Sequence, residues 1–254
     1  MAFLPGYIQE GRAMGRYVLS TVTAPKIAVL YQNDDLGKDF LVGFKSGLGG
    51  KANDLIVSEQ TFEVADPTID QQVIAAKASG ANVFYFAGAQ KAGAEQIRER
   101  HDLGWTPLHL VCSIASGVEG VLKPAGLENA EGLISTAYAK DPFDPTWADD
   151  PDAKAFLEWV KANLTQGNPR DSGVVVGYIA SFLAAYVLDK AGSTLTRDNL
   201  LNVATHLNNV SVPMLLPGIT VTTSPTDYSV INKFQIQRFE SGRWVPVGKT
   251  ISGE

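Results

Sequence analysis

Cysteine, clustered positive charge and long apolar runs are all scarce in this chain, and each shortage excludes a class of protein. Cys112 is the only cysteine, so no disulfide can form within the chain and the redox compartment stays open. The net charge is −6 without any cluster of Lys and Arg, which argues against a nucleic-acid partner or an anionic membrane surface. No apolar run reaches the roughly 20 residues of a membrane span, so we expect no direct membrane insertion.

Signatures of targeting, nucleotides and metals are missing as well. Residues 1–11 have neither a basic n-region nor a long apolar stretch, so no signal peptide is expected, although a chain beginning after a removed signal would look the same. The glycines of residues 47–50 follow a helical pattern, and no G-x-G-x-x-G or Walker lysine pattern is present. The three histidines are scattered without metal spacing. We therefore expect no cofactor and no metal.

Two pairs of side chains suggest catalysis, but neither is convincing. Ser113 and His109 lie four residues apart on one expected strand, which separates them by roughly 13 Å, too far for a nucleophile and its base. Asp34 and Asp35 at a strand end resemble a metal or phosphoacceptor pocket, but no further acid or lysine is suitably placed at the other strand ends. The sequence therefore predicts that the protein is not an enzyme and has no catalytic residues.

The abundant residues predict a globular α/β protein. With 254 residues, 45% hydrophobic and 19% charged, the chain can bury a core. Residues 26–31 form a short apolar run, as in strands buried on both faces of a parallel sheet. Residues 32–37 have turn chemistry, and residues 40–48 have helical spacing. A strand, a tight loop and a helix are thus expected over residues 24–50.

This strand–helix pattern repeats up to residue 138, after an initial helical pattern that ends at Thr23. Further strands are expected at 55–62, 82–87, 108–114 and 133–138. The helices between them are expected at 69–79, 90–103 and, briefly, 118–122. Alternation at this spacing predicts a doubly wound parallel sheet with right-handed crossovers.

The pattern changes at Lys140, where a proline-broken acidic linker begins. Helices are then expected at 151–164, 174–190 and 196–207, with Gly192 ending the second and Thr196 capping the third. The tail alternates apolar and polar residues, with a hairpin turn at Ser241-Gly242. The second helix has a wide apolar face that needs a partner layer. That face comprises Val174, Val175, Tyr178, Phe182, Tyr186 and Val187.

The strand ends predict where function lies, because open α/β sheets bind ligands outside the carboxyl ends of their strands. Four expected ends face one edge, at residues 33–36, 87–90 and 113–115 and at Tyr138. They offer small residues, a hydroxyl, an amide and an aromatic ring, near helix N-termini that favour anions. Such a surface suits reversible binding of a small acid. The plain alternative for residues 33–37 is a polar turn with an N-cap.

Several short segments occur in the order of a known family. They are residues 25–31, residues 35–40, Gly177-Tyr178, Ala191-Gly192, residues 216–219 and Arg243-Trp244. With these segments the chain resembles, over nearly its whole length, the periplasmic solute-binding proteins of branched-chain amino acid ABC transporters. The resemblance implies a type I periplasmic-binding-protein fold, in which two α/β lobes joined by three crossing segments close on a ligand. It also implies that the first part of the N-terminal lobe is missing before Met1.

Transferred to this chain, the family fold implies four parts. Residues 1–23 are the first crossing and an incoming helix, and residues 24–139 are a complete C-terminal-type α/β lobe. Residues 140–212 are the helical remainder of a second, incomplete lobe of the N-terminal type. Residues 213–254 contain the third crossing and the terminal strands.

The expected ligand-binding residues lie at strand ends or crossings. They are Tyr7, Asp35, Leu36, Ala89, Gln90, Ser113 and Tyr138. Hinge packing is the plain alternative for Tyr7 and Tyr138. The family often has tyrosine where this chain has Leu36, and its amino-acid binders usually have a carboxylate near Ser113-Ile114. Both departures favour an aromatic or other small carboxylate over an amino acid.

The resemblance implies a periplasmic substrate-binding component of an ABC importer, with permease subunits as partners. The alternative is a sensory or regulatory ligand-binding domain of the same fold, although no helix-turn-helix or basic arm is present. Neighbouring permease and ATPase genes would favour import, and a neighbouring kinase or operator-binding protein would favour sensing. With part of a lobe missing and an apolar helix face exposed, residues 1–254 alone are expected to bind ligand weakly and to form a homodimer or aggregate.

Overall fold

The computed structural model describes residues 4–254, which form two compact units. The larger, here called the sheet unit, comprises residues 7–137 and 234–254. The described part of the smaller, here called the helical unit, comprises residues 4–6 and 138–233. The chain therefore passes between the units three times. The four-part division expected from the family stays a prediction, since these units group the first helix and the terminal strands with residues 22–137.

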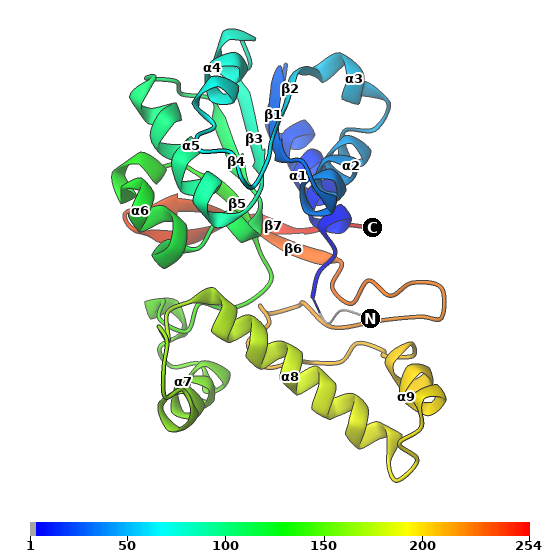
Figure 1. Ribbon diagram of the computed structural model, residues 1–254. Helices are drawn as coiled ribbons and strands as arrows, with labels where there is room; N and C mark the ends of the chain where they lie inside the picture. Colours follow the sequence, from blue (N-terminus) through cyan, green and yellow to red (C-terminus); the bar gives the residue numbers. More distant parts are fainter. Residues whose placement is uncertain (1–3) are drawn as a thin grey trace. The chain divides into compact units, whose positions relative to one another are not determined.

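A seven-stranded, mostly parallel sheet forms the centre of the sheet unit, which confirms the α/β fold class (Figure 1). Its order is β2-β1-β3-β4-β5-β6-β7, with β1 to β5 parallel and β6 antiparallel to β5. The strands are β1 (Ile27–Gln32), β2 (Ile56–Phe62), β3 (Val83–Ala87), β4 (Leu108–Val111), β5 (Ile134–Ala137), β6 (Lys233–Glu240) and β7 (Arg243–Ser252). All five residues of β3 are buried, as expected for an interior parallel strand.

Helices cover both faces of this sheet, with α1 and α2 on one side and α4 and α5 on the other (Figure 1). The helices of the sheet unit are α1 (Tyr7–Thr21), α2 (Asp35–Leu48), α3 (Ala52–Leu55), α4 (Asp70–Ala78), α5 (Gln90–Asp102) and α6 (Lys123–Ala125). Glycines let α1 and α2 touch through their backbones. A Cβ at Gly43 would lie 2.1 Å from the Ile8 carbonyl oxygen, and one at Gly11 would lie 2.3 Å from the Phe40 oxygen.

The fourth strand ends earlier than its apolar run predicts. Strand β4 stops at Val111, and Ser113–Ala115 form a 3₁₀ turn in place of the expected strand to residue 114. The Ser113 N–H donates to the Glu10 carboxylate at 2.7 Å. The strand cannot continue its ladder there because this backbone donor is bound to a side chain.

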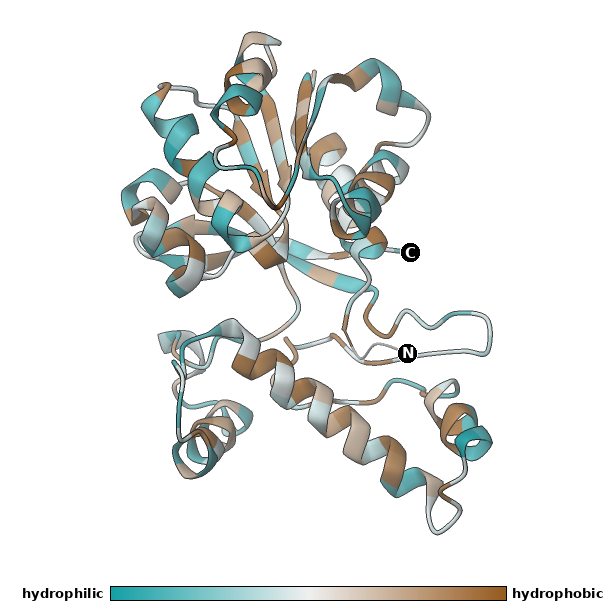
Figure 2. Cartoon of the chain, viewed as in Figure 1, coloured by the Kyte–Doolittle hydropathy of each residue, from teal (hydrophilic) through white to brown (hydrophobic). Residues whose placement is uncertain are grey.

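The helical unit builds its core from α7 (Pro151–Asn163), α8 (Ser172–Ala191), α9 (Arg197–Ala204) and the irregular segment that follows. Thr196 caps α9 and Gly192 ends α8, as predicted. One stripe of α8 is buried in the unit's own cluster: Val175, Ile179, Leu183 and Val187. Of the predicted apolar face, Phe182 remains exposed, and Figure 2 shows further hydrophobic bands along this helix.

By length and composition alone, α8 is also the one helix among residues 4–254 that could cross a membrane. Mostly buried core helices meet the same criterion, but only 22% of the apolar window of α8 is buried, as a stripe in the core of the helical unit.

Candidate functional site

The turn after β1 is fixed by side chains that bind backbone groups. Asp34 caps α2 by accepting from the Gly37 N–H at 3.2 Å. The buried Gln32 donates to Asp34 and accepts from the Ala89 N–H at 3.1 Å. Gly37 is required here because a Cβ would lie 2.1 Å from the Gln32 carbonyl oxygen. Gln32 therefore holds the ends of β1 and β3 together.

Four predicted residues lie on these two neighbouring strand ends. Asp35 is exposed at the first position of α2, and Leu36 is half-buried against the core of the sheet unit. Ala89 occupies the N-cap position of α5 and Gln90 its exposed first position. All four residues thus lie at one edge of the sheet, because β1 and β3 are neighbours in the strand order. They are Asp35, Leu36, Ala89 and Gln90.

A buried carboxylate occupies the next strand ends. Glu10 in the first turn of α1 is 2% exposed, and its Oε1 accepts from the Ser113 N–H at 2.7 Å and the Thr136 hydroxyl at 2.8 Å. Its Oε2 accepts from the Ser113 hydroxyl at 2.7 Å. Burial raises the pKa of Glu10 above its ordinary value, although these hydrogen bonds act in the opposite direction. Ser113 therefore lies at the predicted edge, but both of its donors are engaged by Glu10.

The two tyrosines belong to different units. Tyr7 begins α1 in the sheet unit, stacks on Phe40 with ring centroids 4.9 Å apart, and remains 37% exposed. Burial of its partly covered hydroxyl raises the pKa of Tyr7. Tyr138 lies in the helical unit, where its carbonyl accepts from the Leu216 N–H at 2.9 Å. The structure therefore brings six of the seven predicted residues onto one unit, and Tyr138 stays a separate prediction.

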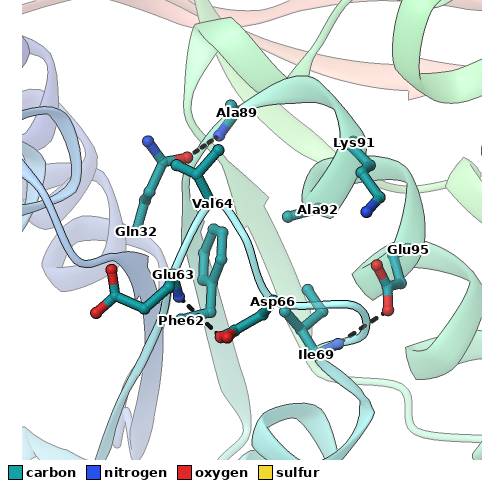
Figure 3. A pocket seen from close by; sticks show the side chains of 10 residues that line it. All are labelled: Gln32, Phe62, Glu63, Val64, Asp66, Ile69, Ala89, Lys91, Ala92 and Glu95. Carbon is teal, nitrogen blue, oxygen red and sulfur yellow. Dashed lines mark hydrogen bonds between the residues drawn. The ribbon is translucent and has the colours of Figure 1, made fainter.

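A shallow opening of about 320 Å³, part of it open solvent, lies beside the ends of β2 and β3 (Figure 3). Of the predicted residues only Ala89 lines it. Its remaining lining is Gln32, Phe62, Glu63, Val64, Asp66, Ile69, Lys91, Ala92 and Glu95. The Glu95 carboxylate accepts from the Ile69 N–H at 2.9 Å, and Asp66 accepts from the Glu63 N–H at 2.8 Å. These acids order the loop after β2 through its backbone.

Two residues that organise the strand ends, Glu10 and Gln32, were not among those predicted from the sequence. Glu10 lies four residues before the buried Met14, so a charged residue on an apolar helix face was the available signal. Gln32 is a polar residue at the end of a buried strand and gave no comparable signal. Within residues 4–254, no group of three or more His, Cys, Asp and Glu side chains could hold a metal ion.

The fold is that of a type I periplasmic binding protein. The sequence of residues 1–243 matches the periplasmic binding protein family, and the chain belongs to that family. The family's name places its members in the periplasm, and its named relatives are binding proteins.

Among curated relatives, the chain is 27% identical to Leu/Ile/Val-binding protein homolog 3 of Brucella melitensis biotype 1, covering 93% of this chain and 60% of that protein. An amino acid binding protein of Pseudomonas aeruginosa is 26% identical over 61% of this chain and 39% of its own length.

Solved structures share the fold. A branched chain amino acid ABC transporter protein from Thermus thermophilus with bound valine has a TM-score of 0.76 at 17% identity, covering 97% of this chain and 65% of that one. A leucine binding protein from Thermotoga maritima has a TM-score of 0.73 at 20% identity, covering 96% and 65%. The present chain thus spans less than two thirds of the length of these relatives.

Proposed function

We propose that this chain is the substrate-binding component of an ABC importer and reversibly binds a small carboxylate, aromatic or amino acid-like, at the strand ends of the sheet unit. The family match over residues 1–243 carries this proposal. The arrangement of side chains supports it, because Gln32, Asp34 and Glu10 are used to fix loops rather than to activate a nucleophile. Location in the periplasm and contact with permease subunits belong to the same proposal.

A thermal-shift screen of amino acids and aromatic acids tests the proposal, with ligand up to millimolar concentration because the chain spans only part of its relatives. A ligand at about 100 times its Kd stabilises a protein by about 2.7 kcal/mol, which corresponds to a rise in Tm of roughly 5 °C or more for a chain of this size. A neutral sugar serves as the control. No response to any acid, together with measurable turnover of one of them, would contradict the proposal.

The expected homodimer is a separate prediction. Sedimentation velocity over a range of concentrations tests it, and a monodisperse monomer would contradict it.

A further inference from the structure

The places where the chain crosses between its two units are tied together on the side of the sheet unit. The crossings lie at residues 6–7, 137–138 and 233–234. Glu10 is in the first turn of α1, directly after the first crossing, and its Oε1 accepts from the Thr136 hydroxyl at 2.8 Å. Thr136 is on β5, directly before the second crossing. Glu10 therefore joins the first crossing to the second.

The third crossing reaches the same cluster through β6. This strand pairs with the end of β5, where Gln235 lies opposite Ala137. The Gln237 side chain also donates to the Thr136 carbonyl at 3.4 Å. Thr136 is thus bound by Glu10 through its hydroxyl and by β6 through its carbonyl. The sheet-unit ends of all three crossings belong to one hydrogen-bonded cluster.

Glu10 makes the most bonds in this cluster. It is 2% exposed, and its two oxygens accept three hydrogen bonds, two from Ser113 and one from Thr136. Hydrogen bonds to a carboxylate are roughly twice as strong as those between neutral groups when the carboxylate is ionised. Removal of the Glu10 carboxylate should therefore loosen the start of α1, the end of β4 and the end of β5 together.

The second crossing is also fixed on the side of the helical unit. The Tyr138 carbonyl accepts from the Leu216 N–H at 2.9 Å, and the next residue, Ala139, forms a β-bridge within the same unit. The buried Lys140 then forms an ion pair at 2.8 Å with Asp150, the N-cap residue of α7. The chain is therefore held from the residue at which it enters the helical unit.

One peptide linkage separates these two held sides. Ala137 belongs to the ladder between β5 and β6, whereas Tyr138 is bound within the helical unit. The ψ angle of Ala137 and the φ angle of Tyr138 are the soft torsion angles between them. Hinges in proteins are a few residues at the ends of elements that absorb a change in φ and ψ. The end of β5 has this position.

We infer that Glu10 is the positioning residue of a hinge: it holds the sheet-unit ends of the three crossings together, so that the two units turn about the linkage between Ala137 and Tyr138. The inference goes beyond the proposed function, because it assigns residues to the motion of the units and is the same for any ligand.

The distance between two spin labels, one on each unit, tests the inference in the full chain. Lys51→Cys in the sheet unit and Lys161→Cys in the helical unit provide exposed positions for the labels. Cys112 is buried, and burial raises the pKa of its thiol to about 12, so it should not react with the label. Pulsed electron paramagnetic resonance then gives the distribution of distances between the labels.

Glu10→Gln removes the carboxylate with little change of shape. It should raise the population of distances outside the main peak by about tenfold, as expected for the loss of one hydrogen bond to a charged group. Gln32→Met is the matched control, because Gln32 is also buried but holds the ends of β1 and β3 together through Ala89. The control should lower the Tm and keep the distribution. An unchanged distribution in Glu10→Gln, or an equal change in both variants, overturns the inference.

A matched pair of glycine substitutions tests the position of the pivot. Ala137→Gly and Ala139→Gly each remove one methyl group from a half-buried residue, but Ala137 borders the linkage and Ala139 does not. Glycine has access to more of φ/ψ space than alanine, so Ala137→Gly should widen the distribution more than Ala139→Gly. Equal widening, or a larger effect of Ala139→Gly, places the pivot elsewhere and overturns the inference.

A Glu10 variant that does not fold leaves another measurement. If circular dichroism shows that Glu10→Gln is unfolded, Thr136→Val takes its place, because it removes the bond between Glu10 and β5 and leaves the two bonds from Ser113. The same widening is expected, and an unchanged distribution overturns the inference. None of these measurements needs a ligand, so their outcome is independent of the proposed function.

Discussion

The sheet unit and the helical unit bury their apolar residues in different ways. Strands β1 and β3 supply nearly continuous buried residues, and α1 and α2 approach closely enough for their backbones to touch. In the helical unit, α8 buries only every fourth residue, and a Cβ at its Gly177 would meet open space. A strand between two layers of helices buries side chains on both of its faces, whereas a separate helix buries only one stripe. The sheet unit should therefore tolerate substitutions less well.

Core truncation should show the largest difference between the units. Leu30 on β1 and Leu183 on α8 are both fully buried, so their replacement by alanine is a matched pair. Each should lower the free energy of unfolding by roughly 2–5 kcal/mol, with Leu30→Ala at the upper end because strands on both sides prevent the cavity from collapsing. Denaturant titrations followed by tryptophan fluorescence measure both losses.

The tryptophans are divided so that each unit has its own probes. Trp105 and Trp244 lie in the sheet unit, and Trp147 and Trp159 lie in the helical unit. Variants that retain the tryptophans of only one unit report the unfolding of that unit. Leu30→Ala should shift mainly the transition of the sheet unit, and Leu183→Ala mainly that of the helical unit. Equal shifts in both probes would show that the two units unfold together and would remove the contrast between them.

Two helical glycines should respond with opposite signs. Gly43→Ala places a Cβ against the Ile8 backbone between α1 and α2, so we expect a loss of stability of roughly 1–3 kcal/mol. Gly177→Ala on α8 meets no atom and removes backbone freedom from the unfolded chain, so we expect a gain of about 0.5–1 kcal/mol. Thermal unfolding monitored by circular dichroism measures both. Stabilisation by Gly43→Ala would contradict the close helix contact.

Acid sensitivity should distinguish the units at a smaller scale. His109 on β4 is buried against Phe84, and neither of its ring nitrogens has a hydrogen-bond partner among residues 4–254. Burial lowers the pKa of this imidazole well below its usual range. Below about pH 6.5 the unfolded chain takes up a proton that the folded chain does not, so stability falls as the pH falls. At about pH 5.5, one unit lower, the burial of His109 should reduce the free energy of unfolding of the sheet unit by about 1.4 kcal/mol.

Comparison with His109→Leu isolates this effect. The raised pKa of Glu10 acts in the opposite direction, but it does so in both proteins and cancels in the difference. Unfolding curves at several pH values test the prediction, and an unchanged slope in His109→Leu would contradict it.

The sheet unit was largely predictable from the sequence because its signals are local. Apolar runs such as residues 26–31 and 82–87, with turns between them, predict strands and their parallel order. The site was less predictable, because Glu10 and Thr136 are brought together only by the folded sheet. No local pattern indicates that a side chain from α1 will end β4 at Val111. In the helical unit the caps at Thr196 and Gly192 were local signals, but the packing of the irregular segment after α9 was not.

The return of the chain to its sheet at β6 has a consequence for synthesis on the ribosome. Strand β5 is complete at Ala137, but its antiparallel partner begins only at Lys233, after residues 138–232. During that interval the outer edge of β5 has free backbone groups, and such edges are open to pairing with other chains. Loss of the last twenty residues would remove most of β6 and all of β7, and so would leave the edge of β5 without its partner strand. We therefore expect the truncated protein to aggregate during synthesis.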